Sequence, residues 1–190
     1  MYLDQDTQSL YWVEGYQDTG SCSIKKSTIS NFNPQNVIII NSDADGISDL
    51  WVSNVDGLVY WTDGSKIFNN LNNTANVFYD HALYGNNGFM WVNNFCIDEA
   101  NNRIFIADNI GRIADGYDEN TMFNYSTING GSNSGIAELI CDSENEMIYF
   151  IKTNYYQDNY LQSGWFINSV SYELEAEPEL IISEDMLYDS

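Results

Sequence analysis

The chain has 190 residues, of which 44% are hydrophobic and 15% aromatic, so it can build a folded core and is not a disordered tail. Its 28 acidic residues against 6 basic ones give a formal net charge of -22. Nucleic acids and anionic membranes are bound through Lys and Arg, so this charge argues against both and favours a basic protein, a cation or a neutral surface as partner. No apolar run approaches the roughly 18 residues that span a bilayer, so we expect no membrane insertion.

One pattern of an apolar strand, an acidic turn and an aromatic strand recurs along the chain. Its four complete copies are MYLDQDTQSLYWVE, LWVSNVDGLVYWTD, FCIDEANNRIFIAD and LICDSENEMIYFIK, starting at Met1, Leu50, Phe95 and Leu139. The turns open at Asp4, Ser53, Asp98 and Asp142, and Asp189 opens a fifth turn before the sequence stops. In each complete copy the second strand follows the turn residue at the same offset, while the outer period varies. A fixed internal offset within a variable period indicates a structural repeat with loops of different length.

The remainder of each period supplies two further short strands, rich in β-branched and aromatic residues. Periods of about 40 to 45 residues with four strands are typical of β-propeller blades. We therefore predict an all-β fold of four-stranded antiparallel blades, arranged in a single propeller region over residues 1–190. The expected blades cover residues 1–40, 47–80, 88–128 and 135–182, and a further blade begins at 186–190.

The second copy contains the tetrapeptide Tyr60-Trp61-Thr62-Asp63, and the other three copies are degenerate versions of it. In this respect the chain resembles the YWTD, or low-density lipoprotein receptor class B-like, β-propeller family. The resemblance implies a six-bladed propeller of an extracellular or particle-surface protein. It also implies that the acids ending the motif strands, Glu14, Asp63 and Asp108, have structural hydrogen-bonding roles. Four blades and part of a fifth leave three alternatives: further blades outside this sequence, blades from another chain, or a small closed propeller.

Asp43, Asp45 and Asp49, together with Gly46, resemble a calcium-binding loop. Alternate carboxylates offer several hard oxygen ligands to one ion, and glycine allows the sharp turn. The bidentate Glu of the helical calcium loop is missing, since Val52 stands at that position. A plain polar loop between blades is the alternative, because Asp and Gly are common turn residues.

Two further features are candidates for surface functions. Tyr155, Tyr156, Tyr160 and Trp165 lie in and after the longest loop, where Tyr and Trp are favoured for protein binding because they bury large areas with few rotatable bonds. Packing of that loop on its own blade is the alternative. The sequons at Asn72 and Asn124 predict surface glycosylation in a secreted protein.

The three cysteines, Cys22, Cys96 and Cys141, are odd in number and sparse, and they form no CxxC pair. This pattern predicts neither a disulfide framework nor a zinc site. Cys96 and Cys141 lie within apolar runs, so we expect both to be small buried hydrophobic residues.

The sequence favours a non-catalytic protein-binding or assembly module at an extracellular or particle surface. It has one histidine and no phosphate-binding glycine loop or hydrolase motif, so we expect no enzyme activity and no cofactor other than calcium. Two alternatives stay open. One is a structural subunit of a fibre or shell whose propeller is completed by another chain, and the other is a calcium-dependent propeller hydrolase or lyase. For the assembly state, a homo-oligomer and a segment of a longer chain both stay open.

Overall fold

The computed structural model describes most of the chain as antiparallel β-sheet. The described residues are 1–16, 21–41, 46–80, 92–108, 111–116, 122–124, 134–154, 164–174 and 179–183. Side chains at the ends of some strands, such as Ile39, Asn124 and Trp165, lie outside this description. Met186–Ser190, the expected start of a further blade, also lies outside it. In the described part of the chain no helix is long and apolar enough to cross a membrane.

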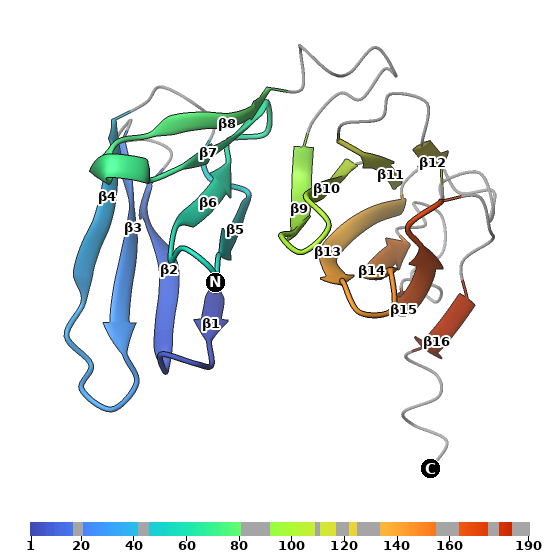
Figure 1. Cartoon of the computed structure of the whole chain (residues 1–190), viewed down its shortest axis with the longest axis horizontal. Coiled ribbons are helices and arrows are strands. Elements are labelled where there is room, and N and C mark those ends of the chain that lie inside the picture. The colour runs from blue at the N-terminus through green and yellow to red at the C-terminus, as the bar shows by residue number, and fades with distance from the viewer. Residues whose placement is uncertain are drawn as a thin grey trace. The chain divides into compact units, whose positions relative to one another are not determined.

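The chain divides into two compact units, Met1–Asp80 and His81–Ser190, and each contains two four-stranded sheets (Figure 1). Unit 1 holds blade 1, with β1 (Tyr2–Asp4), β2 (Ser9–Tyr16), β3 (Ser21–Thr28) and β4 (Gln35–Asn41), and blade 2, with β5 (Asp49–Val52), β6 (Val59–Thr62), β7 (Lys66–Asn69) and β8 (Asn76–Asp80). Unit 2 holds blade 3, with β9 (Val92–Asp98), β10 (Arg103–Asp108), β11 (Arg112–Asp115) and β12 (Met122–Asn124), and blade 4, with β13 (Ser134–Asp142), β14 (Met147–Asn154), β15 (Gly164–Ser171) and β16 (Glu179–Ser183). In every sheet the strands pair in sequence order, so each blade is an antiparallel meander. The prediction of all-β, four-stranded blades is confirmed.

The repeated turn residues close the hairpin between the first two strands of every blade. Asp4 Oδ1 accepts hydrogen bonds from the backbone N–H groups of Asp6 and Thr7, both at 3.0 Å. Ser53 Oγ accepts the equivalent pair, from Val55 at 3.1 Å and Asp56 at 3.0 Å. Asp98 and Asp142 accept backbone N–H groups of their own turns in the same manner. A short side-chain acceptor therefore satisfies turn donors that the sheet leaves unpaired, which explains why the repeat contains Asp or Ser here.

Four residues after each of these acceptors, the backbone enters the left-handed region. The residues are Gln8, Gly57, Asn102 and Glu146, with φ of 52°, 72°, 52° and 52°. Only Gly adopts this conformation without a steric cost from Cβ, and Asn tolerates it better than most residues. The repeat thus fixes the shape of the turn, although only blade 2 has the residue best suited to it.

Gly57→Ala should destabilise unit 1 by about 1 kcal/mol, because Ala at positive φ is strained. A Cβ at Gly57 would meet nothing within 4 Å, so the loss would come from the backbone alone. The opposite exchange at the matching position of blade 4, Glu146→Gly, should be neutral or stabilising. Urea unfolding of both variants checks this, and equal destabilisation by the two exchanges would contradict it.

Within each unit the two blades pack face to face. Each blade has two faces, which we name by the residue that comes one position before the turn acceptor. The leading face carries that residue, which is Leu3, Val52, Ile97 or Cys141 in blades 1 to 4. The opposite face is the trailing face. Strands alternate their side chains, so residues six and eight positions after the acceptor share the leading face, whereas those seven and nine positions after it share the trailing face.

In unit 1 the trailing face of blade 1 packs on the leading face of blade 2. Tyr11, Ile24 and Ile38 from blade 1 join Val52, Val59 and Trp61 from blade 2 in one buried cluster. Unit 2 repeats the arrangement, with Phe105, Ala107 and Ile113 from blade 3 against Leu139, Ile148 and Phe150 from blade 4. Both cores therefore use the same positions of the repeat.

Cys96 and Cys141 form a disulfide between the first strands of blades 3 and 4, with 5.7 Å between their Cα atoms. The expectation that both are unlinked hydrophobic residues is therefore wrong. Cys96 lies on the trailing face of β9 and Cys141 on the leading face of β13, so the two strands present them to one another. Cys22 is a half-buried free thiol in unit 1, where burial raises the pKa of that thiol.

Candidate functional site

The YWTD tetrapeptide forms part of the interior of unit 1. Tyr60, Trp61 and Thr62 are buried in β6, and Trp61 stacks on Phe68 with ring centroids 5.8 Å apart. Asp63 Oδ1 accepts hydrogen bonds from the backbone N–H groups of Ser65 and Lys66, both at 2.9 Å. The motif acid therefore caps the turn between the second and third strands of its own blade.

Asp108 occupies the matching position of blade 3 and adds an ion pair to the same cap. Its Oδ1 accepts the backbone N–H of Arg112 at 2.9 Å, and its Oδ2 pairs with the Arg112 guanidinium. Asp108 is fully buried and Arg112 nearly so. A carboxylate with a bound guanidinium is the arrangement that makes burial of a charge tolerable.

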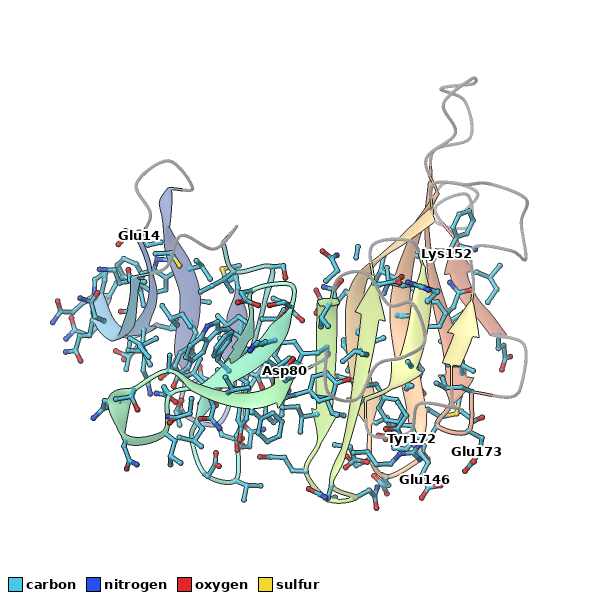
Figure 2. All side chains as sticks on the ribbon, turned by 90° about the horizontal axis from the view of Figure 1, so that it is seen from above. Glu14, Asp80, Glu146, Lys152, Tyr172 and Glu173 are labelled. Atoms are coloured by element: carbon cyan, nitrogen blue, oxygen red, sulfur yellow. A yellow bond between two sulfur atoms is a disulfide. The ribbon has the colours of Figure 1, made fainter. Side chains whose placement is uncertain are left out.

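Blades 1 and 4 have longer hairpins at this position, and their side chains differ. Glu14 is exposed and forms an ion pair with Lys25 at 3.1 Å. Lys152 is buried at one end of the blade 4 sheet, while Glu146, Tyr172 and Glu173 gather at the other end (Figure 2). Burial lowers the pKa of Lys152.

The calcium, loop and glycosylation predictions fall mostly outside the described residues. Asp43 and Asp45 lie outside them, and Asp49 Oδ1 accepts the N–H of its neighbour Leu50 at 2.7 Å. Within the described ranges no three His, Cys, Asp or Glu side chains gather into a group that could hold a metal ion.

Tyr155, Tyr156 and Tyr160 also lie outside the described residues. The backbone of Trp165 pairs with Thr153, and its side chain lies outside the description. Asn72 is exposed in the turn Leu71–Asn73, whereas the backbone of Asn124 pairs with Arg112 in the blade 3 sheet. Calcium binding, partner binding by the loop and glycosylation stay predictions.

A polar and aromatic cluster joins blades 3 and 4 at the end of the sheets where Tyr172 lies. Arg103 donates to Asp115 Oδ2 from Nε at 3.0 Å and from Nη2 at 2.8 Å, and Nη2 also reaches the Tyr172 carbonyl oxygen at 3.1 Å. The same guanidinium lies over the rings of Phe105 and Tyr172, which are 4.6 Å apart.

Asp98 and Tyr172, at this end of blades 3 and 4, have shifted pKa values. Burial alone would raise the pKa of Asp98, but hydrogen bonds from Ser143 and Asn101 outweigh burial and lower that pKa. Burial and the nearby Asp98 carboxylate raise the pKa of Tyr172 well above its usual value. The Tyr172 hydroxyl makes no hydrogen bond of normal geometry, so we attribute its proximity to Asp98 to an electrostatic contact only. At neutral pH Asp98 is ionised and Tyr172 is protonated. We name Arg103, Asp115, Phe105, Tyr172 and Asp98 together the clamp between blades 3 and 4, because they connect the two blades through hydrogen bonds and ring contacts.

The turn aspartates should make the fold sensitive to acid. Hydrogen bonds from Thr7 lower the pKa of Asp4, and hydrogen bonds from Asn145 lower that of Asp142; the pKa of Asp98 is lowered as well. A carboxyl whose folded pKa is depressed stabilises the fold above its unfolded value of about 3.9 and loses that contribution as pH falls through the folded value.

We expect the urea midpoint to fall between pH 5 and pH 2, and to fall less in Asp98→Asn. Blade 2 provides the matched control, because Ser53 does not titrate and Ser53→Asp should increase the acid sensitivity. An Asp98→Asn variant with the pH dependence of the original chain would contradict this account.

The trailing face of blade 4 has no blade of this unit against it. The exposed Glu138 of β13 and the buried Ser169 of β15 lie on this face, paired with Ile151 and Tyr149 of β14. Its apolar residues are Ile140 from β13, Tyr149 and Ile151 from β14, and Ile167 from β15. Ile140 is 56% exposed and the other three are half-buried. Their counterparts on the trailing face of blade 3, Cys96, Phe105 and Ala107, are fully buried by blade 4. Large exposed apolar patches on folded proteins mark interaction sites.

The leading face of blade 1 likewise has no blade of its own unit against it, and we name these two the open faces. Leu3 is 47% exposed, and Leu10 and Trp12 are half-buried, whereas the matching residues of blade 2 are buried. Trp12 stacks on Phe32, which is 66% exposed, with ring centroids 5.6 Å apart. Blade 2 also has a Trp–Phe stack, between the buried Trp61 and the half-buried Phe68 of β7, whereas Phe32 lies in the loop between β3 and β4. We take these two open faces as the candidate functional site.

Comparison with known proteins identifies the fold and no activity. No protein-family model matches the sequence, and a search of curated proteins gives no match. Among solved structures, a protein from Lactobacillus plantarum aligns with 95% of this chain at 12% identity and a TM-score of 0.56. The aligned part is 55% of that protein, so this chain spans about half its length. At this identity the likeness establishes the fold alone.

Two further solved structures are more distant. A chain of the Chaetomium thermophilum Nup170 NTD–Nup53 complex aligns with 92% of this chain at 13% identity, over 28% of its own length, with a TM-score of 0.41. Sqt1 from Saccharomyces cerevisiae aligns with 93% at 9% identity, over 58% of its own length, with a TM-score of 0.44. Neither likeness bears on function, and the YWTD resemblance stays a prediction.

The open faces were not among the sites proposed from the sequence, although the repeat contains the signal for them. Once two blades are known to pack through fixed positions, the same positions on the other faces identify residues with no blade of their own unit against them. Periodicity alone predicts which residues share a face of a strand, but not which face a neighbouring blade covers.

Proposed function

We propose that this chain is a non-catalytic protein-binding and assembly module that works through its open blade faces. The observation that carries the proposal is the trailing face of blade 4, where Ile140, Tyr149 and Ile151 stand where blade 3 has fully buried residues. Exposing such a face to water is unfavourable by about 25 cal/mol for each Å² of apolar surface, so a protein that covers it gains binding energy.

Four ionisable groups in the turns and between blades 3 and 4 have pKa shifts that suit a structural role, whereas burial moves the pKa values of Lys152 and Glu138 toward neutrality. Catalytic acids and bases need pKa values near the working pH, whereas Asp4, Asp98 and Asp142 have lowered pKa values and Tyr172 a raised one. All four groups are thus held away from neutrality, in turns and in the clamp between blades 3 and 4.

We place the module at an extracellular or particle surface. The disulfide Cys96–Cys141 supports this location, because disulfides persist in oxidising compartments and are rare in reducing ones. The strong negative charge favours a partner with a basic or neutral contact surface.

Site-specific photo-crosslinking tests the proposal. A photoreactive phenylalanine analogue replaces Tyr149 on the trailing face of blade 4, and the protein is illuminated in a surface extract of its source. We expect adducts of defined mass. The control carries the same analogue at Val55, an apolar turn residue that is 80% exposed and belongs to neither open face. Adducts equal to those of the control would overturn the proposal.

A further inference from the structure

We propose that the partner of the trailing face of blade 4 is the leading face of blade 1 in a second copy of this chain, a head-to-tail contact that rests on the proposed function and names its partner. The contact is heterologous, since each copy offers one face of each kind. It would bury Leu3, Leu10 and Trp12 of one copy against Ile140, Tyr149 and Ile151 of the next.

The two blade pairs in the structure show how such faces fit. In each pair, the next blade covers an aromatic residue that lies seven positions after the turn acceptor. This residue is Tyr11 in unit 1 and Phe105 in unit 2. The covering residues lie six and eight positions after the acceptor of that blade, Val59 and Trp61 in unit 1, Ile148 and Phe150 in unit 2. Leading face on trailing face is therefore the packing rule of this repeat.

The two open faces have the residues that this rule requires. Tyr149 of blade 4 is the counterpart of Tyr11 and Phe105, with the aromatic ring retained. Leu10 and Trp12 of blade 1 are the counterparts of Val59 and Trp61. Each Trp stacks on a Phe, which comes from the loop between β3 and β4 in blade 1 and from β7 in blade 2. Leu10, Trp12 and Tyr149 would thus reproduce the Val59, Trp61 and Tyr11 set within the core of unit 1.

Charge and the sheet edge also bear on the contact. At a net charge of -22 per copy, long-range repulsion opposes association, so salt should strengthen it by screening. In unit 2, Asn94 Nδ2 on the trailing side donates to the Ala137 carbonyl oxygen of the next blade at 3.1 Å. First strands of neighbouring blades thus lie side by side, which would bring β13 of one copy next to β1 of the other.

The disulfide of unit 2 supplies a geometric test. Cys96 stands two residues before its turn acceptor on a trailing face, and Cys141 stands one residue before its acceptor on a leading face. The same two positions in the proposed contact are Ile140 of one copy and Leu3 of the other. In a Cys22→Ser background, Ile140→Cys protein and tagged Leu3→Cys protein are mixed at 0.3 M salt under mild oxidation. We expect a reducible heterodimer to form at least tenfold faster than either homodimer. It should also form at least tenfold faster than the heterodimer in a control mixture of Ile140→Cys with Val55→Cys protein.

Variants with a charge introduced on one open face provide the second measurement, by analytical ultracentrifugation. Leu3→Glu and Ile140→Glu protein should each be monomeric alone, because each has lost one face. Their equimolar mixture should form a dimer that stops at two copies, through the intact trailing face of the first and the intact leading face of the second. Both substitutions replace well-exposed side chains, so we expect both proteins to fold.

Three results would overturn the inference. They are a monomer in all mixtures, equal rates of homodimer and heterodimer formation, and a dimer of either Glu variant alone, which would indicate contact between like faces. If the purified chain stays monomeric while Tyr149 still crosslinks other proteins in the extract, the proposed function stands and the second copy is not the partner. If neither occurs, both proposals fail.

Discussion

Reduction of the Cys96–Cys141 disulfide should lower the free energy of unfolding of unit 2 by about 4 kcal/mol. The bond closes a loop with a sequence separation of 45 residues, and a cross-link of that span limits the unfolded chain by about this amount. It also joins the first strands of two blades whose shared core contains Phe105 and Phe150. We therefore expect unit 2 to unfold well before unit 1 once the bond is reduced.

The measurement is urea unfolding with and without a reductant, followed by hydrogen exchange at amides of β10 and β14 in unit 2 and of β2 and β6 in unit 1. Cys96→Ala/Cys141→Ala protein should behave like the reduced chain. Cys22→Ala serves as the control, since Cys22 is the free thiol of unit 1, and it should leave the response to the reductant unchanged. Equal stability of the oxidised and reduced chains would show that the bond does not constrain the fold.

Asp108→Asn should destabilise unit 2 by about 3 to 5 kcal/mol. Asp108 is fully buried, and its carboxylate pairs with the buried Arg112 guanidinium. Removing one partner of a buried ion pair leaves a charge in a poorly solvated position, and this is what makes such substitutions costly. The neutral amide keeps the shape of the side chain, and its oxygen can still accept a hydrogen bond from the backbone N–H of Arg112. The decrease in the free energy of unfolding therefore measures the effect of removing the carboxylate charge.

The repeat offers a matched control for this prediction. Asp63 holds the same position in blade 2 and accepts turn N–H groups of Ser65 and Lys66. Asp63→Asn should therefore cost about 1 kcal/mol or less. The double variant Asp108→Asn/Arg112→Met should recover part of the loss, because it removes the charge left behind. Thermal unfolding of the four proteins measures the difference, and equal effects at Asp63 and Asp108 would refute the argument.

The turn residues show how far the local pattern predicts structure. Asp4, Ser53, Asp98 and Asp142 were aligned by spacing alone, and each caps the same hairpin in the structure. Each cap consists of hydrogen bonds between residues two or three positions apart, so the local sequence is enough to predict it. Strand alternation is equally local, which is why the four-stranded blades could be predicted.

The cysteines show where that reasoning fails. Cys96 and Cys141 lie in apolar runs, and hydrophobicity alone predicts two buried thiols. The repeat register adds the missing information, because the two residues are offset by one position and so lie on opposite faces of their strands. They meet only if a trailing face packs on a leading face, and that arrangement is a property of the tertiary structure.

The sequence by itself determined the all-β, four-stranded antiparallel blades and the turn acceptors that close their hairpins, because these depend on contacts between neighbouring residues and on the two-residue period of a strand. The tertiary structure decided which faces pack together, that Cys96 and Cys141 are bonded, and that Ile140 and Tyr149 are left on an open face. Packing between blades joins residues from different repeats, such as Cys96 and Cys141 with a sequence separation of 45. Several apolar residues of similar size can fill such positions, so the pattern marks the positions as apolar without naming their partners.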